Sequence, residues 1–281
     1  MLKSIPFLAA SVAILAASPA LADPILSSSA NVASVNLSVA DVVAANATLA
    51  PVSGTAAPDY VDSLDLVSID QGFHLFGTIL SVDAGVSTGI VSTLAQSAYP
   101  GSATGAANIA GAETGIYTSL LGAVPLAALG LSADAVTSTT VAGIDGAGLF
   151  AAGASSIENL AISGSILDGL GLDLGLFSNP LPNTVALSLL GLEITLNEQL
   201  VDQTDSSIMM TTNAVHISLD DYLFSGRLLS GDIILGHSQA SVTGYEPAAA
   251  PVPEPATWAM MIGGLGLVGL CQRRRARLAF A

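Results

Sequence analysis

Hydrophobic and small polar residues alternate over two stretches in the first third of the chain. The first stretch runs from Ala30 to Val43, and the second runs from Leu64 to Val82. The apolar positions of the second stretch are Leu64, Leu66, Ile69, Phe73, Leu75, Ile79 and Val82. A period near two residues is typical of a strand with one buried face. Both stretches are therefore predicted to form β-strands interrupted by turns.

A β-hairpin is predicted between residues 185 and 219. Alternating aliphatic residues from Val185 to Leu196 lead into the polar segments 197–199 and 202–207. In the return run, 208–219, Ala214, His216 and Ser218 fall on one face, while Val215, Ile217 and Leu219 fall on the other. This is the pattern of a half-buried strand. A further strand is predicted from Asp232 to Ala240.

Small residues dominate the stretch from Ala84 to Gly153, where short helices or irregular structure fit the sequence as well as strands do. Short strands that recur with turn residues between them predict an all-β fold, a β-sandwich or a β-rich single domain with a poorly structured Ala/Gly section. A β-solenoid is the alternative, because small residues suit tight coils, but no fixed period is visible. An N-terminal signal helix and a C-terminal transmembrane helix are expected to be detached from this body.

The N-terminus has the pattern of a secretory signal peptide over residues 1–22. Lys3 precedes an apolar run from Ile5 to Ala17, which is followed by Ser18-Pro19-Ala20-Leu21-Ala22. The small residues Ala20 and Ala22 fit the signal peptidase rule, so cleavage after Ala22 is predicted to leave Asp23 first. An N-terminal membrane anchor is the alternative, but it requires about 20 apolar residues, and this run is shorter.

Three segments follow one another at the C-terminus, from residue 251 to residue 281. Pro251-Val252-Pro253-Glu254-Pro255 holds the backbone extended, because prolines deny it helix and ladder hydrogen bonds. The apolar residues 256–271 are predicted to form a transmembrane helix of roughly 24 Å, with Trp258 at the interface. The basic end, 273–277, contains Arg273, Arg274, Arg275 and Arg277. These arginines are expected to hold the C-terminus in the cytoplasm, so that the body, 23–250, lies on the far side of the membrane.

Residues 253–259, Pro-Glu-Pro-Ala-Thr-Trp-Ala, with the arginine cluster behind them, resemble the PEPxxWA variety of PEP-CTERM sorting signals. The resemblance implies recognition by an exosortase, a membrane protease-transpeptidase that removes the tail, in a Gram-negative bacterium that makes exopolysaccharide. It also implies that Pro253, Glu254, Pro255 and Trp258 are the recognition elements. A plain single-span anchor with a proline-rich stalk is the alternative that the physical pattern alone allows.

The body resembles the choice-of-anchor P family over roughly residues 110–245. Six blocks carry this resemblance in order: Leu120-Leu121-Gly122 with 131–136, then 155–164, Pro182-Asn183-Thr184, 194–199, 213–219 and 231–240. The resemblance implies an extracellular, β-rich surface module with no established activity.

Acidic residues dominate the body. The chain has 22 Asp and Glu and 6 Lys and Arg; Lys3, Glu254 and four arginines lie in the two ends, which leaves 21 acidic residues against Arg227 alone. The resulting formal charge of about −20 argues strongly against nucleic-acid binding. It favours divalent cations, or it keeps the protein soluble in a polyanionic matrix. The one cysteine, Cys271, lies in the tail, so the body cannot form an internal disulfide.

No catalytic constellation is predicted. His74, His216 and His237 are present, but the chain lacks a G-x-S-x-G elbow and clustered zinc ligands, and each histidine is interpreted as an ordinary sheet residue. For calcium, the candidates are Asp59, Asp62, Asp65 and Asp70, and the lone segment Gly169-Leu170-Gly171-Leu172-Asp173. A solvated acidic face is preferred to a calcium site. Asn197-Glu198-Gln199 is interpreted as structural rather than as a polar binding site.

The sequence therefore predicts an exported, non-enzymatic structural or adhesive component of an exopolysaccharide layer, with no cofactor. It would pass through the Sec machinery, signal peptidase and a transient inner-membrane stage, then meet an exosortase and reach the cell surface or the extracellular space. A calcium- or polysaccharide-binding module is the first alternative. A matrix hydrolase that uses His237 or His74 with a carboxylate is the second.

Overall fold

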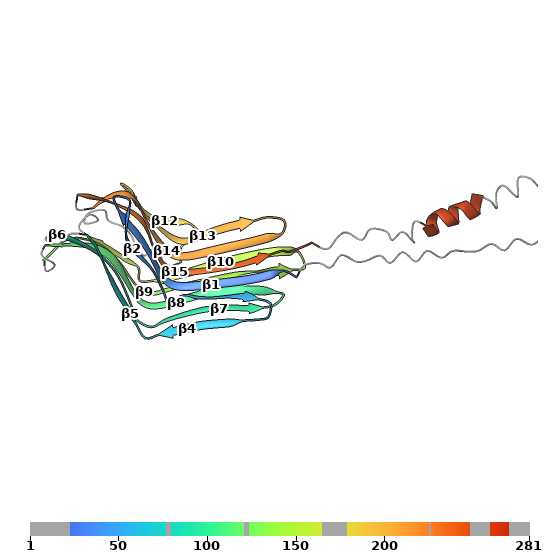
Figure 1. The fold of residues 1–281 in the computed structure, drawn as a ribbon, viewed down its shortest axis with the longest axis horizontal. Coiled ribbons are helices and arrows are strands. Elements are labelled where there is room, and N and C mark those ends of the chain that lie inside the picture. Colours follow the sequence, from blue (N-terminus) through green and yellow to red (C-terminus); the bar gives the residue numbers. More distant parts are fainter. Residues whose placement is uncertain are drawn as a thin grey trace, which may run out of the picture. The chain divides into compact units, whose positions relative to one another are not determined.

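The computed structural model describes residues 23–76, 80–120, 124–164, 179–224, 226–247 and 259–269. Contacts divide the chain into one unit that ends at Glu246 and another that begins at Pro247. The described residues of the first unit form fifteen strands in two antiparallel sheets, as expected for a β-sandwich (Figure 1).

One sheet has the order β12-β13-β14-β15-β1-β2, with β3 also paired to β1. Its strands are β1 (Ile25–Val39), β2 (Val42–Leu49), β3 (Val52–Ala56), β12 (Thr184–Leu189), β13 (Leu192–Gln203), β14 (Ser207–Phe224) and β15 (Arg227–Thr243). We call it the seven-stranded sheet.

The other sheet has the order β10-β9-β8-β6-β5, with β11 on β9, β7 on β8 and β4 on β7. Its strands are β4 (Val61–Leu66), β5 (Ile69–Phe76), β6 (Leu80–Thr88), β7 (Val91–Ala98), β8 (Ser102–Leu120), β9 (Val124–Asp145), β10 (Gly148–Glu158) and β11 (Ala161–Gly164). We call it the eight-stranded sheet.

The core lies between the two sheets. Its largest buried side chains include Leu37, Ile116, Leu196, Leu235 and Phe224. All three clusters of buried apolar residues draw their members from positions between Leu26 and Val242. Because the described core lies within these positions, we expect a chain of residues 23–247 to fold on its own.

Both sheets bend along one line, which Figure 1 shows as a curve in the long strands. At this line β13, β15 and β8 each contain a residue with positive φ, namely Asn197 (50°), Gly236 (63°) and Gly111 (66°). The pairing registers skip Asn197 on β13 and Gly236 on β15, and they continue without a shift on either side of these residues. At Gly236 a side chain would also crowd Ala214 and Val136, whose atoms lie 3.1 and 3.2 Å from an added Cβ.

The bend line divides the sandwich into two halves, because the long strands change partners there. β1 pairs with β2 on one side and β3 on the other, β8 pairs with β6 and then β7, and β9 pairs with β11 and then β10. We call the half that contains β3, β7 and β10 the terminal half, since Ile25 pairs with Thr243 at its end. The distal half contains β2, β5, β6, β11 and β12.

Short helices or irregular structure were one expectation for Ala84–Gly153, and that expectation was wrong. This stretch forms most of β6 to β10, including the two longest strands. Small residues let the sheets approach closely in the terminal half. A Cβ added at Gly105 of β8 would lie 2.4 Å from the carbonyl oxygen of Ser29 on β1. Thr140 and Ser238 share a buried hydroxyl hydrogen bond of 2.8 Å between the sheets. Close packing and ladder bonds thus replace the large side chains that the sequence lacks.

The predicted hairpin is confirmed as β13 and β14, with Val215, Ile217 and Leu219 buried. Three details differ from the expectation. The run from Val185 to Leu196 lies in two strands, β12 and β13, which are separated by a turn at Leu190 and Gly191. Residues 197–199 lie inside β13 at the bend, so the turn is confined to the residues between Gln203 and Ser207. Ala214 is buried, because it lies at the bend, opposite Asn197 and beside Gly236, where the alternation of faces is interrupted.

The expected signal helix, 1–22, lies outside the described residues. In the tail, a helix is described only over residues 259–269. None of the helices in the described part of the chain has the length and apolar character that crossing a membrane requires. The expected transmembrane helix, 256–271, is thus not found as such, since eleven residues span only about 16 Å against a bilayer core of about 30 Å.

Candidate functional site

Four glycines lie in one row across the outer face of the eight-stranded sheet, in the distal half. The pairing registers place Gly72 of β5 opposite Gly85 of β6, Gly85 opposite Gly115 of β8, and Gly115 opposite Gly130 of β9. Three strand spacings of about 4.8 Å make this row about 14 Å long. Because glycines carry no side chains, the row forms the floor of a groove.

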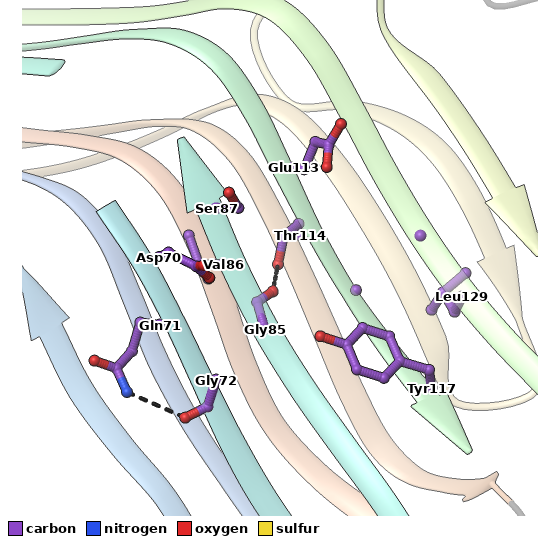
Figure 2. A pocket seen from close by; sticks show the side chains of 12 residues that line it. Asp70, Gln71, Gly72, Gly85, Val86, Ser87, Glu113, Thr114, Tyr117 and Leu129 are labelled. Atoms are coloured by element: carbon purple, nitrogen blue, oxygen red, sulfur yellow. Dashed lines mark hydrogen bonds between the residues drawn. The ribbon is translucent and has the colours of Figure 1, made fainter. Parts of the chain in front are cut away.

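The groove has a volume of about 200 Å³, and Figure 2 shows the side chains around it. Asp70, Ser87 and Glu113 lie in the neighbouring row on one side of the glycines. Tyr117 lies in the row on the other side, beside Asp83. The groove is therefore walled by two carboxylates and a hydroxyl on one side and by an aromatic ring on the other.

Tyr117 reaches over the glycine floor. A Cβ added at Gly85 would lie 2.4 Å from the phenol oxygen of Tyr117, so this ring position requires a glycine beneath it. Burial raises the pKa of Tyr117, and the negative charges of Asp83 and Asp70 raise it further. The phenol therefore stays protonated at neutral pH and can donate a hydrogen bond into the groove.

Backbone groups of Gly85, Gly115 and Gly130 are committed to the sheet, because each of these glycines pairs with a strand on both sides. Over these three positions the groove cannot recognise a ligand by adding another strand. It can offer carboxylate acceptors, hydroxyl groups and one face for ring contact. A carboxylate-lined groove with one aromatic side chain suits a flat ligand that is rich in hydroxyl groups.

A second polar arrangement lies on the outer face of the seven-stranded sheet, at the bend. His216 lies between Glu198 and Asp232, with Nδ1 3.0 Å from Glu198 Oε2 and Nε2 2.9 Å from Asp232 Oδ1. The hydrogen bonds to Asp232 and Glu198 raise the pKa of His216 from 6.5 to about 9. At neutral pH the imidazolium thus donates from both nitrogens, which leaves it no lone pair to act as a base.

The network continues through Asn213 to His237. Asn213 Nδ2 donates to Glu198 Oε2 (2.7 Å), so its Oδ1 accepts from Nδ1 of His237 (2.8 Å). Burial lowers the pKa of His237, and the ring is neutral at pH 7. These residues join β13, β14 and β15 where the sheet bends, and we assign them a structural role.

The other candidates from the sequence are dispersed. His74 pairs with Asp83 at 2.7 Å on the exposed face. Asp59 accepts a hydrogen bond from the backbone of Tyr99, and Asp62 accepts one from that of Ser53. Across the described ranges between residues 23 and 269, no three His, Cys, Asp or Glu side chains are grouped so that they could hold a metal ion.

The predicted processing residues fall almost entirely outside the described part of the chain. Asp23 is described and exposed, just before β1. The other processing residues lie outside: Ala20, Ala22, Pro253, Glu254, Pro255, Trp258, Arg273, Arg274, Arg275 and Arg277. The calcium candidate segment 169–173 also lies outside the described residues.

Sequence reasoning missed the glycine row, although a signal for it exists. Three of its glycines follow an acidic residue by two positions, in Asp70-Gln71-Gly72, Asp83-Ala84-Gly85 and Glu113-Thr114-Gly115. Strand periodicity places each such pair on one face. Because β6 runs antiparallel to β5 and β8, Asp83 falls on the opposite side of the row from Asp70 and Glu113.

Comparison with known proteins identifies the tail. The PEP-CTERM protein-sorting motif matches residues 251–275. No curated protein and no solved structure matches the chain. The motif identifies an exported protein that an exosortase processes, held transiently at the membrane and then located at the surface.

Proposed function

We propose that the body is a non-enzymatic, adhesive component of an exopolysaccharide layer and that it holds a polysaccharide strand in the glycine-floored groove. The groove on the outer face of the eight-stranded sheet carries this proposal. Sugar hydroxyls donate to carboxylates such as Asp70 and Glu113, while the apolar face of a sugar ring packs on an aromatic ring such as Tyr117.

The position of the groove supports the same role. The first and last strands of the body, β1 and β15, meet at the end of the terminal half, where Ile25 pairs with Thr243. The groove lies in the distal half, beyond the bend. A body attached at the C-terminal end of β15 would present this groove away from the point of attachment.

We infer, from the blocks between residues 110 and 245, that the body is related to the choice-of-anchor P family. A structure of a family member that lacks the strand order β12-β13-β14-β15-β1-β2 would contradict this relation.

Filling the groove tests the function. At Gly72 an added Cβ meets no atom within 4 Å, so Gly72→Val is expected to fold normally and to block one end of the floor. Binding of residues 23–247 to exopolysaccharide purified from the producing strain, measured by affinity electrophoresis, should weaken at least about tenfold, a loss of ~1.4 kcal/mol. Because no metal and no catalysis form part of the proposal, EDTA should leave the retardation unchanged and no new reducing ends should appear.

Ala154→Val is the matched control. Ala154 is exposed on β10 in the terminal half, so this substitution adds the same side chain to the same sheet outside the groove. The control should bind as the parent protein does. Equal binding by the Gly72→Val protein, or no binding by the parent protein, would overturn the proposed function.

A further inference from the structure

The groove carries unpaired negative charge. Asp70 and Glu113 flank Ser87 in one row of the sheet, and neither carboxylate makes a hydrogen bond or ion pair with any described residue. Across the floor, Asp83 is held by His74 (2.7 Å) and by the hydroxyl of Ser81 (3.0 Å). The two acids of the first wall are thus free to bind a ligand.

Basic residues do not offset this charge. Arg227 is the sole Lys or Arg between residues 23 and 250, and its guanidinium lies over the ring of Phe76, 5.3 Å from the ring centroid. It is not among the residues that line the groove. A polymer of uronic acids would meet only like charge there.

We propose that the ligand of the groove is an amino-sugar polymer that carries free ammonium groups, as a partly deacetylated hexosamine chain does. This inference rests on the proposed function and specifies its ligand. The ammonium groups pair with Asp70 and Glu113, whose strands lie two spacings or about 10 Å apart, while a sugar ring lies on the glycine floor against Tyr117.

The spacing of the two acids suits a repeating ligand. Asp70 and Glu113 lie on strands that are separated by β6, so two amines of one polymer can each pair with one carboxylate. Glycines at four consecutive positions across the sheet leave room for a chain rather than for one ring.

The test compares three oligosaccharides of equal length on residues 23–247 by isothermal titration calorimetry, at a pH where sugar amines are protonated. The three are a fully deacetylated glucosamine oligomer, its N-acetylated form and an oligogalacturonate. The deacetylated oligomer should bind tightest and the oligogalacturonate should not bind. Raising the salt from 0.1 to 1 M should weaken the deacetylated oligomer most, because the screening length falls from about 10 to about 3 Å.

Asp70→Asn and Glu113→Gln should each weaken the deacetylated oligomer about three- to fivefold, the size of an exposed ion pair. They should weaken the N-acetylated form less, because the amide oxygen still accepts hydrogen bonds from sugar hydroxyls. Asp205→Asn, in the turn between β13 and β14, makes the same change in net charge away from the groove and should have no effect.

Each other result would count against the inference. Equal binding of the two glucosamine oligomers, or binding of the native polysaccharide alone, would overturn the amino-sugar assignment and leave the proposed function standing. An oligolysine that binds as tightly would overturn the assignment to a sugar. Failure of every oligosaccharide and of the native polysaccharide would overturn both.

Discussion

Replacing His216 by Gln should remove a pH-dependent part of the stability of the body. The hydrogen bonds to Asp232 and Glu198 raise the pKa of His216 from 6.5 to about 9. At ~1.4 kcal/mol per pKa unit, this shift corresponds to about 3 kcal/mol of stability. Because the side chain of Asp232 is 45% exposed, solvent screening reduces our expectation to about 2 kcal/mol.

The sign follows from the direction of the shift. A group whose pKa is raised on folding contributes fully below its unfolded pKa, so the contribution of His216 is complete below pH 6.5 and disappears as the pH rises through about 9. The pKa values of Glu198 and Asp232 are lowered, mainly by the hydrogen bond from His216, so their contributions are lost on acidification instead. The network should therefore stabilise the body most strongly between about pH 5 and pH 6.5.

Urea unfolding of residues 23–247, followed by far-ultraviolet circular dichroism at pH 6 and pH 9.5, measures this effect. The parent protein should lose about 2 kcal/mol more than the His216→Gln protein between the two pH values. His74→Gln is the control, because His74 also pairs with a carboxylate but its side chain is 57% exposed. That variant should follow the parent protein. Parallel pH profiles for the parent and the His216→Gln protein would refute the reasoning.

Two further predictions concern the packing of the sheets and the processing of the chain. Gly105→Val should destabilise the body by more than about 3 kcal/mol in the same urea assay, because its Cβ would lie 2.4 Å from a carbonyl oxygen of β1. The control Gly146→Val, in an open turn, should destabilise it by less than about 1 kcal/mol. A Gly105→Val protein as stable as its parent would contradict the close approach of the sheets. Intact mass of the protein recovered from its host should correspond to a chain that begins at Asp23 and lacks Trp258. A chain that still reaches Ala281 in the membrane fraction would contradict removal of the tail.

Local pattern was sufficient to predict the strands whose two faces differ in polarity. Val215, Ile217 and Leu219 alternate with His216 and Ser218, and they are buried as that alternation predicts. The long strands β8 and β9 were not predicted, because Ala, Gly, Ser and Thr give little contrast between faces. Their strand structure depends on ladder bonds and on the close approach of the opposite sheet, which are properties of the assembled sandwich.

The candidate site depended on information that local pattern does not contain. Gly72, Gly85, Gly115 and Gly130 are dispersed over almost sixty positions, and only the pairing registers bring them into one row. In the same way, Glu198, His216 and Asp232 meet because β13, β14 and β15 pair side by side next to the bend at Asn197 and Gly236. Periodicity predicts the face of a side chain, but the partner strand and its register decide which side chains meet.

The pairing of β1 with β15 also determines how the body would carry a mechanical load. Tension between a polymer in the distal half and a tether at residue 247 would run along β15 rather than across it, because that strand extends from Arg227 to Thr243. β15 is bonded to β14 on one side and to β1 on the other over nearly its whole length. Such a force shears two ladders at once, and many hydrogen bonds share the load instead of opening one after another. Under the proposed adhesive function, β15 would therefore be the strand that resists pulling most strongly.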